Sequence, residues 1–290
     1  MSIYEKILVG LDGSKESFNA FKNALFLGKQ LKAEVSALYV VHITSEISSA
    51  LSLFIGMKEL FKKSGELILK EAQSIAEEEG VSVNLLLEEG DPSNKIVDMV
   101  YAKDINLLVM GKSGKGGLEK ALLGSTASRV IGSSPVDVLI IPKNSKLNFN
   151  KILVPVDGSK YSEEAVQRAI DFASYFKSSV ILLSVIEIPI EFYETSAEVL
   201  KLLEHIKLEM EEFIRKMKMR FVEKNLEVKS FLLEGIIKDK ILEIANKEEV
   251  DLIIMGSHGK TGLKRLLMGS TTEKVLTLYN KPVLVVKREF

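Results

Sequence analysis

A glycine-spaced motif in this sequence has the residue types that hold a phosphate. Gly111 and Gly114 are three positions apart, and after nine further residues come Gly124 and Ser125. Glycine lets the backbone approach a ligand closely and adopt positive φ. A Gly-Ser pair that opens a helix presents free N–H groups and the positive end of the helix dipole to an anion. The spacing indicates a phosphate or ribose site, with helix-cap and turn glycines as the alternative.

A carboxylate precedes this motif in the chain. Asp12 follows the apolar run Ile7–Leu11 and is followed by Gly13 and Ser14. Asp-Gly is a common turn pair, so Asp12 could be a turn residue, a role that is compatible with ligand binding. Together, the carboxylate at the end of a strand and the glycine motif suggest a nucleotide site.

Both motifs occur twice in the same register. At a constant offset of 145 positions, the carboxylate and the glycine motif recur as Asp157, Gly256, Gly259, Gly269 and Ser270. The constant offset means that no net insertion or deletion separates the copies, which indicates a duplicated domain. We expect one domain at residues 1–143 and a second at residues 150–290. The short polar linker between them, at residues 142–150, would let the domains pack against each other.

Composition excludes several classes of protein. The 290 residues have a net charge of −1, which argues against a nucleic-acid binder. The absence of cysteine excludes disulfides and thiolate metal sites, and it fits a reducing cytoplasm. No signal-peptide pattern opens the sequence, and no uncharged apolar run approaches the ~18–20 residues of a membrane span. We therefore expect a cytoplasmic protein.

Apolar strand patterns alternate with amphipathic helix patterns in each half, as in a parallel sheet that helices cover on both faces. The expected strands are Lys6–Val9, Val35–Val41, Val83–Leu87, Leu107–Met110, Val138–Ile141, Lys151–Val154, Val180–Ile186, Val228–Leu232, Leu252–Met255 and Val283–Val286. Apart from the helices that Ser14 and Ser159 would cap, the expected helices lie near residues 58–79, 92–102, 123–132, 198–224, 236–247 and 269–279. The predicted fold class is α/β, with two copies of a five-stranded, doubly wound parallel sheet.

The strand order predicts where the two motifs meet. Ligands of open α/β sheets bind beyond the carboxyl ends of the strands, where the order of the strands reverses. With the order 3-2-1-4-5, this point lies between the first and fourth strands. The loop that begins at Asp12 and the loop that begins at Gly111 would then border one crevice.

Other residues that could carry chemistry give weaker signals. Gly111-Lys112-Ser113 is not a P-loop, because Asn106 stands where a P-loop needs glycine. His258, in the second glycine motif, could touch a phosphate, but we expect a solvent-exposed loop residue. Three histidines and no cysteine make a transition-metal site improbable.

The combined pattern resembles the nucleotide-binding branch of the universal stress protein family. It consists of Val-x-x-Asp-Gly-Ser after the first strand and Gly-x-x-Gly-x9-Gly-Ser after the fourth. The resemblance covers essentially the whole chain as a tandem pair, and Met255–Gly262 is especially typical of the family. It implies a five-stranded fold like that of the adenine nucleotide alpha-hydrolases, with ATP or AMP bound over the first and fourth strands.

The resemblance also implies the site residues. The adenine would contact the end of the second strand at Val40 and Val185, and the nucleoside would contact Asp12 and Asp157. Ribose and phosphates would be held by Gly111, Gly114, Gly124, Ser125, Gly256, Gly259, Gly269 and Ser270. Residues beside these complete the two predicted sites: Leu11, Met110, Thr126, Pro155, Val156, Met255 and Thr271. A Mg²⁺ or Mn²⁺ ion would be bound through the phosphates, with no catalytic residue and no metal ligand from the protein.

The expected function is that of a stress-response nucleotide sensor or switch with one site in each domain, which acts on an unidentified protein partner. Phosphates at Gly269 and Ser270 would order the basic loop Gly259–Met268. We expect the two sites to differ in affinity, because the first loop lacks the Ser-His pair of the second and because Gly10 stands where the second copy has Pro155. The alternatives are a nucleotide-free oligomerisation module and a slow ATPase. A homodimer and intramolecular pairing of the domains are further expectations from the family.

Overall fold

The computed structural model describes residues 3–42, 55–114, 123–188, 197–259 and 268–287. Its contacts divide the chain into two compact units, the first ending at Leu147 and the second beginning at Asn148. Each unit alternates strands with helices, as the apolar and amphipathic patterns predict.

The elements of the first unit are β1 (Lys6–Leu11), α1 (Lys15–Leu31), β2 (Glu34–Val41), α3 (Ile55–Glu78), β3 (Val83–Glu89), α4 (Pro92–Ala102), β4 (Leu107–Gly111), α5 (Ser125–Ser133) and β5 (Asp137–Ile141). Those of the second unit are β6 (Lys151–Pro155), α6 (Lys160–Phe176), β7 (Ser179–Ile186), α7 (Ala197–Val222), β8 (Val228–Glu234), α8 (Ile237–Lys247), β9 (Leu252–Gly256), α9 (Ser270–Leu278) and β10 (Val283–Val286).

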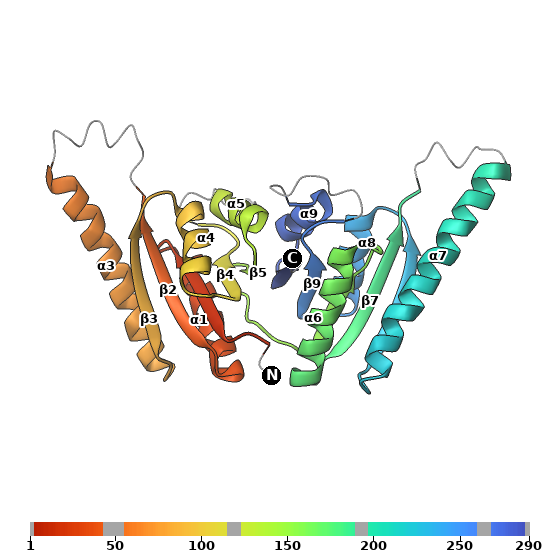
Figure 1. Ribbon diagram of the computed structural model, residues 1–290, viewed down its shortest axis with the longest axis horizontal. Coiled ribbons are helices and arrows are strands. Elements are labelled where there is room, and N and C mark those ends of the chain that lie inside the picture. Colours follow the sequence, from red (N-terminus) through yellow and green to blue (C-terminus); the bar gives the residue numbers. More distant parts are fainter. Residues whose placement is uncertain (1–2, 43–54, 115–122, 189–196, 260–267, 288–290) are drawn as a thin grey trace. The chain divides into compact units, whose positions relative to one another are not determined.

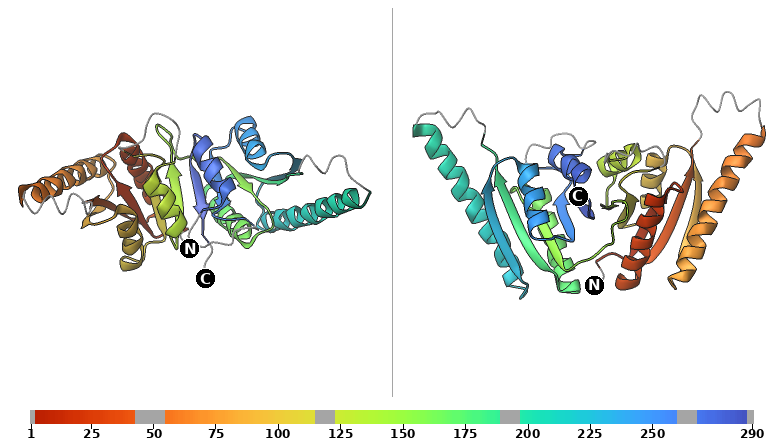
Figure 2. Two further views of the ribbon diagram at one scale, coloured as in Figure 1. Left: turned by 90° about the horizontal axis from the view of Figure 1, so that it is seen from above. Right: turned by 180° about the vertical axis from the view of Figure 1, so that it is seen from behind.

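The strand order confirms the predicted topology. The first unit has the order β3-β2-β1-β4-β5 and the second the corresponding order β8-β7-β6-β9-β10, and the ladders within each unit are parallel. Right-handed crossovers then place α1 and α3 on one face of the first sheet and α4 and α5 on the other. The helices pack in these two pairs, α1 with α3 and α4 with α5. In Figure 1 the first sheet is seen from the side of α4, and in the right panel of Figure 2 from the side of α1.

Capping residues fix where the first helix of each unit begins. The Ser14 side chain accepts a hydrogen bond from the Ser17 amide at 3.1 Å, and Ser159 does the same for Ser162 at 3.1 Å. These bonds satisfy amides that the first turn leaves without a partner in the helix. Because α1 and α6 start directly after β1 and β6, the caps also set the length of the loops that carry Asp12 and Asp157.

The segment after β5 is held against α1. The Asn23 side chain accepts from the Leu147 amide at 2.6 Å, and Asn19 donates to the carbonyl oxygens of Pro142 and Ser145 at 3.1 and 3.0 Å. Most of the stretch read from the sequence as a polar linker is therefore a part of the first unit. The sequence pattern did not reveal these contacts, because the two asparagines lie on α1 and are far along the sequence from the residues that they bind.

The two copies fill one position of the core in opposite ways. In the first unit Gly65 of α3 lies against the Tyr39 ring of β2, and a Cβ on Gly65 would stand 2.7 Å from that ring. At the same two positions the second unit has Ser184 on β7 and Met210 on α7, which are 1% and 9% exposed. The large side chain comes from the strand in one copy and from the helix in the other.

We expect Gly65→Met to destabilise the first unit, because Tyr39 already fills the space. Overpacking of this kind costs about 1–3 kcal/mol. Adding Tyr39→Ser should recover at least half of the loss, since it recreates the pair of the second unit. Urea unfolding followed by circular dichroism measures both changes. The reverse pair, Ser184→Tyr alone and with Met210→Gly, is the matched control, and no recovery in either double variant would contradict this account of the packing.

Candidate functional site

The two sequence motifs meet at the carboxyl ends of the strands in both units. Gly114, in the loop after β4, lies so close to the Asp12 carboxylate that a Cβ there would be 2.3 Å from Oδ2. Gly259 lies in the same way against Asp157, and its Cβ would be 2.7 Å from Oδ2. The neighbouring strands β1 and β4, and likewise β6 and β9, bring these loops together. The meeting of the two loops that the strand order predicts is therefore present in both units.

The aspartates also have the turn role that their sequence allows. Asp12 Oδ1 accepts from the Ser14 amide at 2.9 Å, and Asp157 Oδ1 accepts from the Ser159 amide at 3.0 Å. The glycine that follows each aspartate has a left-handed backbone, with φ of 78° at Gly13 and 79° at Gly158. One carboxylate oxygen thus fixes the turn while the other lies at the opposite loop.

The motif glycines are required for close approach and not for an unusual backbone. None of the six is among the described residues with positive φ, in contrast to the expectation from their sequence. A Cβ on Gly111 would stand 3.2 Å from the backbone of Glu16, and one on Gly256 would stand 2.8 Å from Tyr161 Cβ. Any side chain at these positions would push the loop after β4 or β9 away from the first turn of α1 or α6.

A glycine caps the helix that follows each glycine loop. Gly124 caps α5 and Gly269 caps α9, and neither cap makes a side-chain hydrogen bond. The Gly124 amide donates to Lys112 O at 2.8 Å, which holds the start of α5 against the loop after β4. The exposed first residues of the two helices, Ser125 and Ser270, follow these glycines. Such a helix N-terminus attracts an anion.

The ladder hydrogen bonds place the residues predicted to contact adenine. Ile186 O accepts from the Gly235 amide at 3.0 Å on the β8 side, and Leu183 O accepts at 2.8 Å from the amide of the residue after β6. The N–H and C=O groups of successive residues in a strand point alternately to its two neighbouring strands. Leu183 faces β6 and Ile186 faces β8, so the main-chain groups of Val185 face β6. They border the crevice where β6 has ended. Val40 has the same position and the same alternation in β2.

The glycine loop of the second unit contains a buried aromatic and polar cluster. Ser257 is fully buried and His258 is 8% exposed, which corrects the expectation of a solvent-exposed histidine. Ser257 Oγ lies 3.0 Å from His258 Nδ1, and the rings of His258 and Tyr161 have their centres 5.1 Å apart. No local sequence pattern predicts that His258 is buried against Tyr161, because Tyr161 comes from the start of α6.

Different residues support the corresponding loop of the first unit. Lys112 stands at the position of Ser257, and burial lowers the pKa of its ammonium group. Glu16 takes the position of Tyr161 and lies 3.6 Å from Lys143 Nζ. The two crevices thus share their aspartate and glycines but differ in the side chains behind them.

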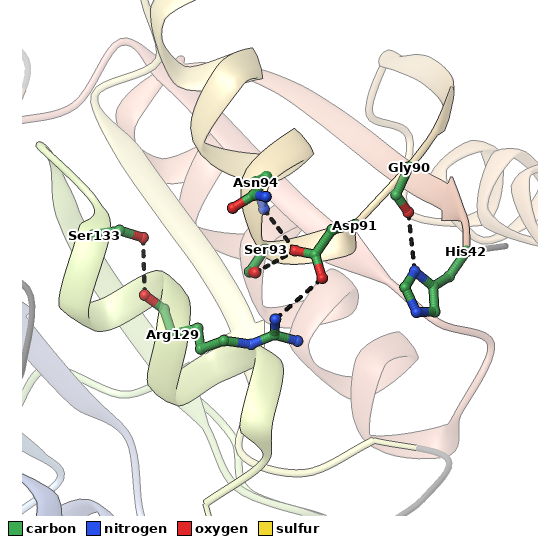
Figure 3. Close-up of polar contacts among 7 residues, drawn as sticks. All are labelled: His42, Gly90, Asp91, Ser93, Asn94, Arg129 and Ser133. Carbon is green, nitrogen blue, oxygen red and sulfur yellow. Dashed lines mark hydrogen bonds and ion pairs between the residues drawn. The ribbon is translucent and has the colours of Figure 1, made fainter. Parts of the chain in front are cut away.

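A further polar cluster connects the residues after β2 and β3 with α5 of the first unit (Figure 3). The Asp91 carboxylate caps α4 by accepting from the Asn94 amide at 3.1 Å, and it accepts from Arg129 of α5 at 3.1 Å. The hydrogen bond from the Ser93 hydroxyl holds the pKa of Asp91 below its ordinary value against the opposing effect of burial, and the Asn94 amide and Arg129 add smaller contributions. His42 Nδ1 lies 3.1 Å from Gly90 O, next to Asp91. Sequence reasoning did not single out either residue of this ion pair.

Two features are absent from the part of the chain that the structure describes. In residues 3–42, 55–114, 123–188, 197–259 and 268–287, no group of three or more His, Cys, Asp or Glu side chains could hold a metal ion. Within the same part of the chain, no helix has the length and apolar character needed to cross a membrane.

The strand order and the paired loops together define a doubly wound α/β domain that is present in two copies. The sequence pattern of the Universal stress protein family matches residues 3–142 and again residues 148–287. Because these matches cover nearly the whole chain, the protein belongs to the universal stress protein family, as a tandem of two such domains.

Individual relatives agree with this assignment. Universal stress protein MJ0531 of Methanocaldococcus jannaschii is 40% identical over 146 residues, which are 50% of this chain and 86% of the relative. Universal stress protein Slr1230 of Synechocystis sp. is 25% identical over 310 residues, with 98% of this chain and 100% of the relative covered. The crystal structure of a universal stress protein from Archaeoglobus fulgidus has the same fold, with a TM-score of 0.75, 22% identity and 100% of both chains covered.

The lowered pKa of Asp91 predicts a pH-dependent contribution to stability. A carboxylate whose pKa is lowered by folding stabilises the folded state at pH values above the pKa of the unfolded chain, which is about 4 for aspartate. This contribution to stability is lost as the pH falls through the pKa of the folded state. Asp91→Asn keeps a cap for α4 but loses the ion pair. We expect it to lower the free energy of unfolding by at most about 1 kcal/mol at pH 7, because the pair is exposed, and by less at pH 3.

Urea unfolding of both proteins between pH 7 and pH 3 measures this difference. Asp98→Asn is the control, since Asp98 is an exposed carboxylate of the same helix whose partner, Lys95, also lies on α4. A difference between Asp91→Asn and the unmodified protein that grows on acidification would show that the sign is wrong.

Proposed function

We propose that each domain binds one adenine nucleotide, ATP or AMP, in the crevice between the loops after its first and fourth strands. The observation that carries the proposal is the contact of the Asp12 carboxylate with Gly114, repeated by Asp157 and Gly259. In both units this contact stands beside a helix N-terminus without a side-chain cap. A carboxylate suits ribose hydroxyls, and open helix amides suit phosphates.

Different residues of the first domain would bind the ribose, the phosphates and the adenine. The Asp12 carboxylate would accept hydrogen bonds from the ribose hydroxyls. The phosphates would accept hydrogen bonds from the amides of the Gly111–Gly114 loop and of Gly124. The hydroxyls of Ser125 and Thr126 would add donors. The main-chain groups of Val40 that border the crevice offer a donor and an acceptor to the adenine edge. The second domain would use its residues at the same offset, from Pro155 to Thr271.

Apolar side chains would complete each crevice. Leu11 and Met110 are 5% and 6% exposed in the first domain, and Val156 and Met255 are each 4% exposed in the second. Leu11, Met110 and Met255 lie at the ends of strands, and Val156 directly follows β6, so a nucleotide would rest on them. A Mg²⁺ or Mn²⁺ ion would be held through the phosphates and not by a cluster of protein ligands.

The proposed role is a nucleotide-dependent switch that a protein partner senses. Membership of the universal stress protein family and the doubling of the site support it. The basic stretch expected to respond, which contains Lys260, Lys264 and Arg265, lies outside the described residues. The switch therefore rests on the sequence and the family, whereas the binding proposal also has the geometry of the crevice behind it.

Nucleotide content tests the binding proposal directly. The freshly purified protein is denatured and the released nucleotide is identified by mass spectrometry and quantified per chain. We expect about two adenine nucleotides per chain, one for each aspartate–glycine contact. Gly259→Ala and Gly114→Ala, which place a methyl group against the carboxylate, should each remove about one, and the double variant both.

The two single variants serve as controls for each other, since each changes one domain only. Differential scanning fluorimetry with added Mg-ATP or AMP checks for sites that are empty after purification, because a bound ligand raises Tm. No released nucleotide together with no thermal shift would overturn the proposed function.

A further inference from the structure

A series of contacts in the first domain runs from the end of β2, where the adenine would lie, to α5, where the phosphates would lie, and Figure 3 shows its part from His42 to Arg129. It starts at β2, where the Gly90 amide donates to Val41 O at 3.0 Å and His42 Nδ1 lies 3.1 Å from Gly90 O. The next residue, Asp91, caps α4 and binds Arg129 of α5. The series therefore joins the strand that carries Val40 to the helix that begins at Ser125.

Arg129 is placed to orient that helix. It follows Ser125 by four residues, so both side chains lie on the same side of α5, one turn apart. Arg129 Nη1 and Asp91 Oδ2 are 3.1 Å apart, and α4 packs against α5. The ion pair thus ties the second turn of α5 to the loop after β3, and the first turn presents its open amides from a fixed direction.

The second domain lacks this link. Ile236 stands at the position of Asp91, and α8 has no side-chain cap. Lys274 stands at the position of Arg129. An isoleucine side chain offers no acceptor, so no ion pair can join α8 to α9 at this point. The main-chain bond from the Gly235 amide to Ile186 O is retained at 3.0 Å, which leaves the difference in the side chains.

We propose that Asp91 and Arg129 are positioning residues that couple the adenine and phosphate ends of the first site and make it unequal to the second. The pair orients the phosphate-binding end of α5 in the free protein, so a ligand that spans both ends does not have to order this helix. It favours ATP over adenosine at the first site, because adenosine touches only the adenine and ribose end. The inference rests on the proposed function, since it concerns the same crevice.

The expected effect is modest because the pair is exposed. The Arg129 and Asp91 side chains are 56% and 27% accessible. Exposed pairs of this kind change an equilibrium by about two- to fivefold. Arg129→Gln should therefore weaken ATP binding at the first site by about two- to fivefold and leave adenosine binding unchanged. Arg129→Lys, which keeps the charge, should restore part of the loss.

Isothermal titration calorimetry with ATP and with adenosine measures both affinities. The variants are made in the Gly259→Ala protein, in which only the first site is open. Asp98→Asn is the matched control, because it removes an exposed ion pair within α4 that does not reach α5. The complementary experiment introduces Ile236→Asp and Lys274→Arg together in the Gly114→Ala protein, and it should raise the preference of the second site for ATP.

A double-mutant cycle separates positioning from direct contact. If Arg129 acts through Asp91, then Asp91→Asn and Arg129→Gln weaken ATP binding equally, and combining them adds nothing. Additive losses, or an Arg129 loss that Asp91→Asn does not share, would assign Arg129 to the phosphates and overturn the inference. An equal loss for ATP and adenosine would overturn it as well, as would no loss at all.

The two proposals fail in different ways. If the protein with both sites intact binds neither ATP nor AMP, the proposed function is wrong. If it binds nucleotide but Arg129→Gln has the affinities of the Asp98→Asn control, only the coupling of the two ends is wrong.

Discussion

The structure depends on one close approach, that of the glycine after the fourth strand to the aspartate after the first. A carboxylate oxygen lies only 2.3 Å from where the Cβ of another residue would be at Gly114, and 2.7 Å from it at Gly259. The strand order, the serine caps and the short loops after β1 and β6 all act to bring these backbones together. Because the other oxygen of each aspartate is used in its own turn, the carboxylate is held in place from both sides.

Much of the fold could be predicted from the sequence because its causes are local. Strands that are buried on both faces have nearly continuous apolar runs, and Ser14 and Ser159 mark helix starts by their own hydrogen bonds. The meeting of the two motifs was predictable as well, since it follows from the strand order alone. The side chains behind the loops were not. His258 is buried against Tyr161 of another element, and Asp91 meets Arg129 across two helices, so no local pattern signals these contacts.

The two copies show which parts of the domain tolerate change. The aspartate and the motif glycines occupy the same positions in both, whereas the loop after the fourth strand is supported by Lys112 in one copy and by Ser257 and His258 in the other. A backbone contact without room for a Cβ accepts glycine alone. A buried layer of side chains accepts many combinations of residues, provided that the total volume is conserved. The differences between the copies therefore lie around the crevice and leave the contact itself unchanged.

The exchange of Tyr39 and Gly65 for Ser184 and Met210 constrains how the copies diverged after duplication. A change from one pair to the other in two steps passes through an intermediate with either two large side chains in the space of one or none. A cavity can relax by partial collapse, while an overfilled core must move a helix that is packed along its length. The route through the smaller pair is therefore the more accessible one. An ancestor with a small residue on both the strand and the helix could have given rise to either descendant by a single enlargement.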